Sequence, residues 1–299
     1  MKAKYLLPHF FKLIGWILTV PGLIAGYFVL FRQYKIPGFG PVDLHNSLSF
    51  PENTYTDELV LTVVVFGTIF LAFAKEKKED ELTCKIRQNA LYWAILINYL
   101  ICIVLLLAAF IKGFFFYDFH NFLELFGYEI VISQYNLFTP LIIFVLRYYY
   151  LLYIKNDEYK IGKLSYLPYK PYRLIAKYIS LALITGFILI YIIKWLSNDT
   201  LDFRRAVDPM FVCLMLSLLG WLYSHEKKED ELINNVRLES MQLAVYFNYA
   251  ILLVANLTLF SGWFLFFMFM NLITIEIFFL IRFYYSLWKL NKEAGELAS

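Results

Sequence analysis

Charged residues, cysteine and histidine are all scarce in this sequence, and each shortage excludes a class of protein. Only 17% of the 299 residues are charged, whereas 61% are hydrophobic and 20% aromatic, which excludes an ordinary soluble globular chain. The three cysteines are scattered without a C-x-x-C pair, so neither disulfide exchange nor a zinc site is predicted. The four histidines fall at or beyond the edges of the hydrophobic runs. That placement argues against haem ligation inside a membrane, and no cofactor is predicted.

What the sequence has in abundance is long hydrophobic runs. A bilayer core requires about 20 apolar residues per helix. We identify eight such runs, at residues 8–31, 58–74, 91–111, 130–153, 174–195, 209–223, 241–257 and 262–287. The second and the sixth are short. The sequence therefore predicts an all-α, polytopic integral membrane protein with eight transmembrane helices.

The basic residues predict how these helices are oriented. With the N-terminus inside, the outer segments hold only these members of the 27 Lys and Arg residues: Arg32, Lys35, Lys112, Lys194, Arg204 and Arg205. Lys and Arg are retained on the cytoplasmic side, so we expect both termini in the cytoplasm. The net charge of +3 follows from this topology and indicates no nucleic-acid partner. The inner cations are expected to contact anionic membrane lipids.

An internal duplication is marked by the heptamer E-K-K-E-D-E-L, which occurs at residues 76–82 and again at 226–232, 150 residues later. Further identities follow at the same offset, and at an offset of 135 nearer the C-terminus. They are Arg87 with Arg237, Asn98-Tyr99 with Asn248-Tyr249, Asn136-Leu137-x-Thr139 with Asn271-Leu272-x-Thr274, and Arg147 with Arg282. The first helix of each half aligns weakly, with Lys12 opposite Lys177.

The duplication predicts two tandem four-helix membrane repeats, at residues 1–155 and 173–299, joined by a basic cytoplasmic linker at 156–172. Because each repeat has an even number of spans, both should insert with the same orientation. We therefore expect a parallel pseudo-two-fold axis along the membrane normal, as in parallel-repeat transporters.

Polar residues at helical spacing are the candidate sites. Asp80, Arg87 and Asn98 are separated by 7 and 11 residues, which places them on one stripe of a helix. A buried arginine calls for an acidic partner, for which Glu79 and Asp80 are candidates, although snorkelling to the headgroups is the alternative. The full set for an ion-pair network or docking surface is Glu76, Glu79, Asp80, Arg87, Arg147, Glu226, Glu229, Asp230, Arg237 and Arg282. The intramembrane polar set is Asn98, Asn136, Asn248, Asn271 and Glu276.

The heptamer itself has three interpretations. As a charged helix extension it needs no function, since Glu81 and Lys85 fit an i, i+4 pair, but this leaves the strict identity of the two copies unexplained. As a metal site it has carboxylates, yet its interleaved lysines and lack of histidine argue against one, and no metal is predicted. Docking of a cytoplasmic or membrane protein partner, together with intramolecular pairing, fits best.

Glu276 stands apart because its counterpart in the first half is Leu141. An intramembrane carboxylate is a functional-site hypothesis by default. It could bind a proton or a cation, or it could be a neutral acid hydrogen-bonded to a neighbouring helix.

The string E-K-K-E-D-E-L, followed by an arginine five residues later and then by a helix with Asn-Tyr, resembles uncharacterised bacterial multi-pass membrane proteins that carry E-K-x-E-D-E segments. The resemblance covers the second-to-third-helix region of each half. It implies a location in the bacterial inner (plasma) membrane and nothing about activity.

Three functions compete. The first is a non-enzymatic sensing, relay or partner-anchoring component that acts through the paired cytoplasmic heptamers. The second is a small transporter or channel with a site between the two repeats. Two features argue against it, namely the small number of glycines (13) and prolines (9) and the lack of a clearly broken helix. The third is a lipid-modifying membrane enzyme, for which the sequence offers no recognisable nucleophile or metal constellation.

Overall fold

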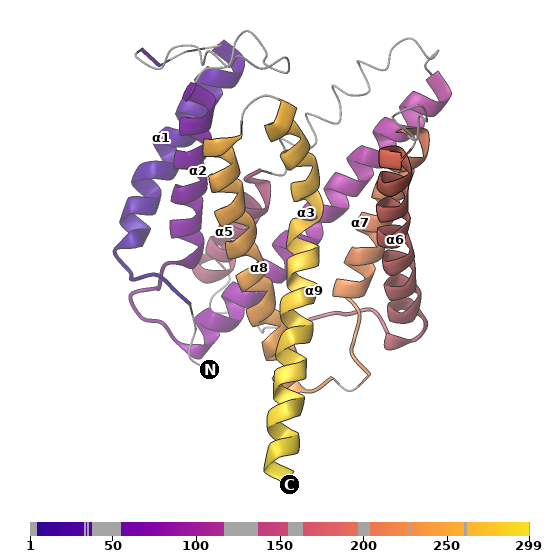
Figure 1. The fold of residues 1–299 in the computed structure, drawn as a ribbon. Coiled ribbons are helices and arrows are strands. Elements are labelled where there is room, and N and C mark those ends of the chain that lie inside the picture. The colour runs from indigo at the N-terminus through magenta and orange to yellow at the C-terminus, as the bar shows by residue number, and fades with distance from the viewer. Residues whose placement is uncertain are drawn as a thin grey trace. The chain divides into compact units, whose positions relative to one another are not determined.

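The computed structural model describes residues 5–32, 34, 36–37, 55–116, 137–154, 164–196, 204–227, 229–259 and 262–298. These residues form α1 (Phe11–Arg32), α2 (Tyr55–Phe73), α3 (Glu81–Phe116), α5 (Thr139–Tyr153), the π-helical turn η1 (Tyr169–Arg173), α6 (Leu174–Leu196), α7 (Arg204–Leu222), α8 (Glu231–Thr258) and α9 (Gly262–Ala298) (Figure 1). The predicted all-α class is confirmed. Asn136 and the first part of the predicted linker, residues 156–163, lie outside the described residues.

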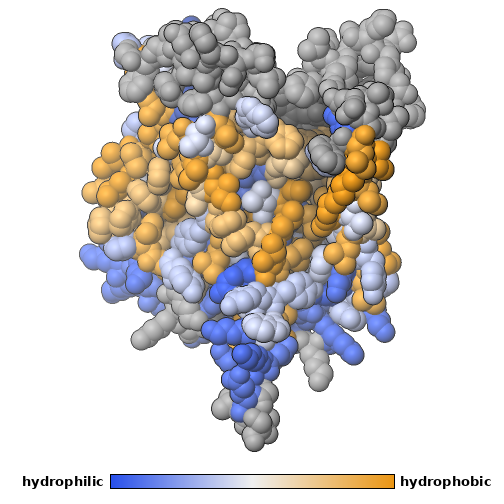
Figure 2. Space-filling model, in the orientation of Figure 1, coloured by the Kyte–Doolittle hydropathy of each residue, from blue (hydrophilic) through white to orange (hydrophobic). Residues whose placement is uncertain are grey.

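Five of these helices are long and apolar enough to cross a membrane, namely α1, α3, α6 (with η1), α8 and α9. The apolar parts of α2, α5 and α7 are shorter, at Glu58–Phe73, Thr139–Tyr153 and Pro209–Leu222. Large apolar side chains are exposed along α1, including Leu13 at 67% and Ile17 at 60%. Such exposure is expected of a helix that faces lipid and not water. Figure 2 shows this apolar cover on α1, and hydrophilic residues at the C-terminal end of α9.

The third helix begins well before the predicted hydrophobic run at 91–111. α3 has 36 residues, or about 54 Å at ~1.5 Å per residue, which exceeds the ~30 Å core of a bilayer. α8 likewise begins at Glu231, ahead of the run predicted at 241–257. Each long helix therefore starts directly after its heptamer's aspartate, and the last two residues of each heptamer belong to the same continuous helix as the membrane-spanning part.

The described chain packs as two compact units. Unit 1 comprises residues 1–98, 133–162 and 245–271, and unit 2 comprises 99–132, 163–244 and 272–299. The predicted repeats divide the sequence at the linker, whereas each packed unit takes segments from both halves, because α3, α8 and α9 each contribute to both units.

A close helix pair lies inside each unit, α1 with α2 in unit 1 and α6 with α7 in unit 2 (Figure 1). At the first crossing, a Cβ added to Gly67 would lie 2.5 Å from Thr19 Oγ1, so only glycine lets these backbones approach. At the second, the hydroxyl of Ser180 donates to Ser217 Oγ at 2.9 Å. Ser217 stands 150 residues after Gly67, which is the offset of the heptamers.

Candidate functional site

The segment before α1 is joined to the loop after α2, which carries the first heptamer. Leu7 forms an isolated parallel bridge with Ala74, in which its amide donates to Phe73 O and its carbonyl accepts from Lys75 N, both at 2.9 Å. His9 Nδ1 also donates to the Lys75 carbonyl at 2.9 Å. This backbone pairing sets the start of α1 beside Glu76.

Glu76 is the first carboxylate of the cluster. Lys12 Nζ, from the first turn of α1, donates to both of its carboxylate oxygens at 2.6 Å. The Tyr148 hydroxyl, from α5, donates to Glu76 Oε1 at 3.1 Å. The Lys12 and Glu76 side chains are only 12% and 11% exposed, so this ion pair is largely shielded from water. Lys12 Nζ also lies 4.8 Å from the centre of the Tyr149 ring, within cation–π range.

Glu79 is the second carboxylate, and it holds Arg87. Arg87 donates to its two oxygens at 2.6 and 3.2 Å, and to the Tyr148 hydroxyl at 3.0 Å. Glu79 also accepts the backbone amide of Glu76 at 2.9 Å, which closes the loop on itself. Arg87 is 4% exposed, so its charge depends on these partners. We call Lys12, Glu76, Glu79, Arg87 and Tyr148 the first cluster.

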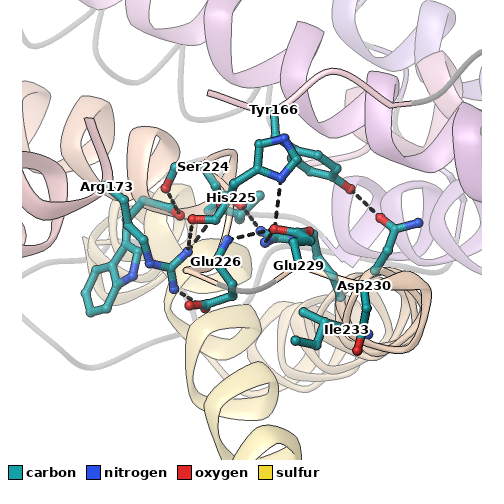
Figure 3. Close-up of polar contacts among 12 residues, drawn as sticks. Tyr166, Arg173, Ser224, His225, Glu226, Glu229, Asp230 and Ile233 are labelled. Carbon is teal, nitrogen blue, oxygen red and sulfur yellow. Dashed lines mark hydrogen bonds and ion pairs between the residues drawn. The ribbon is translucent and has the colours of Figure 1, made fainter. Parts of the chain in front are cut away.

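The second cluster repeats this arrangement in unit 2 and consists of Arg173, Glu226, Glu229, Arg237 and Tyr284. Leu167 bridges Ser224 as Leu7 bridges Ala74, with its amide donating to Tyr223 O at 2.8 Å. Arg173 pairs with Glu226 and donates to the Tyr284 hydroxyl. Figure 3 shows Arg173 reaching Glu226 and the backbone carbonyls before it, those of Ser224 and His225, at 3.2 and 3.1 Å.

Glu229 holds Arg237 as Glu79 holds Arg87. Arg237 donates to its carboxylate through Nε at 3.1 Å and through a terminal nitrogen at 3.0 Å, and also to Leu222 O at 2.8 Å. Glu229 accepts the Glu226 amide at 2.7 Å and His225 Nδ1 at 3.0 Å (Figure 3). Arg237 is 1% exposed, and its guanidinium lies 4.6 Å from the centre of the Tyr166 ring and 5.0 Å from that of the Phe283 ring.

The heptamer aspartates have a different task, which is to cap the long helices. Asp80 Oδ1 accepts the amide of Thr83 at 2.7 Å and its hydroxyl at 2.6 Å. Asp230 Oδ1 accepts the amide of Ile233 at 2.8 Å. A side chain that accepts the amide three residues on is the signature of an N-cap. The two hydrogen bonds from Thr83 hold the pKa of the Asp80 carboxyl below its ordinary value.

The predicted acidic partners therefore separate into two roles. Of the two candidates in each heptamer, the glutamate pairs with the arginine and the aspartate caps the helix. Arg147 donates to the amide oxygen of Asn89 at 3.2 Å and lies 5.4 Å from the Trp93 ring centre. Arg282 contacts the hydroxyl of Ser286. For these two arginines the contacts found among the described residues are an amide, a ring and a hydroxyl, and no acid.

Two cations at the centre of the clusters, Lys12 and Arg173, were not among the predicted site residues. Each contacts the first glutamate of its heptamer, so Lys12 is equivalent to Arg173 and not to Lys177, which the weak alignment suggested. A signal was present in Leu7-Pro8 and Leu167-Pro168, each followed by a cation and then Leu-Ile. The second copy has one extra residue between these landmarks, and that residue falls in η1.

The intramembrane polar residues that the structure describes are all buried. Asn98 and Glu276 are 0% exposed, and Asn248 and Asn271 are 1% exposed. Within the described ranges, no group of three His, Cys, Asp or Glu side chains gathers as a metal ion would require.

Fold and clusters together define an all-helical membrane protein with two ion-paired heptamer loops. No family model, no curated protein and no solved structure matches the chain.

Proposed function

We propose that this chain is a non-enzymatic component of the bacterial inner membrane, which anchors a protein partner through the outward sides of its two heptamers. It has eight spans in two tandem four-helix repeats of common origin, with both termini in the cytoplasm. Support for the duplication comes from the matched contacts, since bridge, ion pairs and caps recur at matched positions of the sequence. Support for the orientation comes from the distribution of Lys and Arg.

The observation that carries the anchoring proposal is the division of labour inside each heptamer. Glu76, Glu79 and Asp80 are engaged within the protein, as are Glu226, Glu229 and Asp230. Their identity in the two copies is explained by structure alone. The lysines between them are not explained in this way.

Lys77, Lys78 and Lys227 are exposed, and the described part of the chain gives their side chains no polar contact. A solvated loop tolerates Glu, Gln or Ser at such positions, so the identity of two adjacent lysines in both copies needs a reason outside the chain. The glutamates on either side of the lysines are neutralised by largely buried cations, so the exposed lysines present a positive charge that fits an acidic surface on the partner. Asp80 and Glu81, and likewise Asp230 and Glu231, are exposed beside them, but each aspartate caps its helix. We therefore assign the docking contact to the lysines, whereas the sequence alone suggested the acids.

The test is in-cell crosslinking followed by affinity capture and mass spectrometry on three forms of the full chain. These are the wild type, a variant with the four heptamer lysines (Lys77, Lys78, Lys227 and Lys228) changed to Gln, and a control with Lys289 and Lys292 changed to Gln. The control lysines are 63% and 62% exposed and pair only loosely, at 3.8 Å, with glutamates on their own helix. The control thus removes exposed charge without touching the heptamers.

A partner captured by the wild type and the control, but lost in the heptamer variant, supports the proposal. Equal capture by all three forms contradicts it. Loss of anionic-lipid binding in the heptamer variant, with no protein captured by any form, would assign the lysines to the membrane surface instead.

A second candidate is a small cation-coupled transporter, favoured by the buried carboxylate of Glu276. It predicts a flux that is lost in Glu276→Gln, and normal flux in that variant would remove Glu276 from the mechanism. A lipid-modifying enzyme is less well supported, because the carboxylates it would use are held in ion pairs with Arg87 and Arg237.

A further inference from the structure

Glu276 occupies a position in α9 where every described neighbour on its stripe is apolar. Leu272, Phe279 and Phe283 stand four residues before it and three and seven residues after it, and each is 1% exposed. These spacings place all four side chains on one face of the helix. Glu276 itself is 0% exposed.

The carboxyl group of Glu276 has no protein partner within the described ranges. Neither Oε1 nor Oε2 has a hydrogen-bond partner there, and no Lys, Arg or His side chain of those ranges forms an ion pair with it. Among the described residues there is therefore no hydrogen bond between this carboxyl group and a neighbouring helix. Cys102, on the part of α3 that belongs to the same unit, is also buried, at 1% exposed.

The matched positions in unit 1 show that packing does not require an acid here. Glu276 corresponds to Leu141 at the offset of 135, and Cys102 corresponds to Leu252 at the offset of 150. Both leucines are buried, at 1% and 0% exposed, and both belong to unit 1. One unit therefore has a pair of leucines where the other has a carboxylic acid and a thiol.

An ionised carboxylate in such surroundings is strongly disfavoured, because no group among the described residues replaces the hydration that it loses. Its charge must be neutralised, and the described residues supply no cation that does so. We propose that Glu276 is a binding site for a small monovalent cation, with the proton as its ligand. A proton needs only the carboxylate, whereas Ca²⁺ requires six to eight oxygen ligands and Mg²⁺ an octahedral set. This inference is independent of the docking proposal, since it involves no heptamer residue.

The experiment is infrared difference spectroscopy of the purified full chain in lipid at neutral pH, wild type minus Glu276→Gln. The expected result is a carboxylic-acid carbonyl band in the wild type that shifts in D₂O and is missing from the variant. Carboxylate bands in its place would overturn the proposal. Replacing choline chloride with NaCl provides the second arm. An acid band that gives way to carboxylate only in NaCl would make sodium the ligand and overturn the assignment to the proton.

A second variant guards against a purely structural explanation. Glu276→Leu copies Leu141 and should fold with a melting temperature equal to or above that of the wild type, while the acid band disappears. A clear fall in melting temperature would mean that the acid holds the helix in place, and would overturn the proposal. Leu141→Glu is the matched control, and it is expected to lower the melting temperature, because it buries a polar group at a position where the protein has a leucine.

Discussion

The two clusters satisfy the same charges with different side chains. In the first, Lys12 is a point charge placed between the two oxygens of Glu76, and the Tyr148 hydroxyl links Glu76 to Arg87. In the second, Arg173 has more donors and reaches two backbone carbonyls as well as Glu226, and the residue matched to Tyr148 is Phe283.

This difference shows which parts of the arrangement are required. Both clusters keep a cation for the first glutamate, an arginine for the second, and an aromatic ring against that arginine. The hydroxyl groups that complete the network have moved. Tyr284 matches Tyr149 and not Tyr148, and its hydroxyl accepts from Arg173 and from Trp221 Nε1 at 2.8 Å. Charge pairing is therefore the fixed element, and hydrogen-bonding hydroxyls are the adjustable one.

The largest difference in stability between the two clusters is expected when the second glutamate of each cluster is removed. Glu229→Ala leaves Arg237 buried without its carboxylate and should cost about 3–5 kcal/mol of unfolding free energy. Glu79→Ala should cost less, because Arg87 keeps the Tyr148 hydroxyl and Ala74 O as acceptors. Chemical denaturation in detergent measures both. Glu81→Ala, which removes an exposed i, i+4 pair with Lys85, is the control and should leave stability unchanged.

The residues at the two helix crossings, Gly67 and Ser217, can each be replaced by the residue found at the matched position. Gly67→Ser places a side chain where a Cβ would lie 2.5 Å from Thr19 Oγ1 and 2.7 Å from Thr19 N, so overpacking should cost about 2–3 kcal/mol. Ser217→Gly at the matched position should cost only about 1 kcal/mol, the size of one hydrogen bond. Thermal unfolding followed by circular dichroism compares them. Equal effects at the two sites would show that the α1–α2 contact is not as close as described.

Removing one oxygen, the hydroxyl of Tyr148, gives the first cluster the same ring as the matched Phe283 of the second cluster. Tyr148→Phe keeps a ring against Arg87 but removes the hydroxyl that bonds Arg87 and Glu76, for an expected loss of about 1.5 kcal/mol. Phe283→Tyr in the second cluster is the reciprocal change and should gain little, since Arg237 already has its acceptors. A larger loss from Phe283→Tyr than from Tyr148→Phe would contradict the proposed roles.

The smallest expected effect concerns the helix cap. Asp80→Ala should cost about 1 kcal/mol, whereas Asp80→Asn keeps an oxygen that accepts from Thr83 and should cost less. Because the folded-state pKa of Asp80 is lowered, its contribution is complete above the ordinary Asp value of about 3.9 and is lost as the pH falls below it. The Asn variant should lack this acid dependence, which pH-dependent unfolding of the two proteins would detect.

How far the sequence predicted this molecule depends on the kind of residue. The hydrophobic runs predicted helices of membrane-spanning length, and the structure confirms the all-α class, with five helices long and apolar enough to cross a membrane. The seven-residue spacing of Asp80 and Arg87 predicted that the arginine has an acidic partner in the heptamer. Spacing alone does not distinguish the aspartate that caps the helix from the glutamate that pairs with the arginine. Lys12 and Arg173 were missed because their pairing crosses from one segment to another, and an inserted residue hides the match.

Arg147 shows a second limit. Depth in the membrane predicted an acidic partner, whereas the structure gives the Asn89 amide and the Trp93 ring. At the position matched to Asn89 the second half has Glu239. Helical spacing predicts which face a side chain occupies, and the neighbour that meets it is decided by packing between helices.

The central claim is that the second glutamate of each heptamer is held by a buried arginine in both units, and a double-mutant cycle tests it most directly. Glu229→Gln, Arg237→Gln and the double variant would be unfolded in parallel, with Glu79 and Arg87 treated in the same way. The account predicts that each double variant is more stable than the sum of its single losses implies, by at least about 1 kcal/mol in both units. Additive losses in either unit would mean that the carboxylate and the guanidinium do not interact there, and would contradict the account.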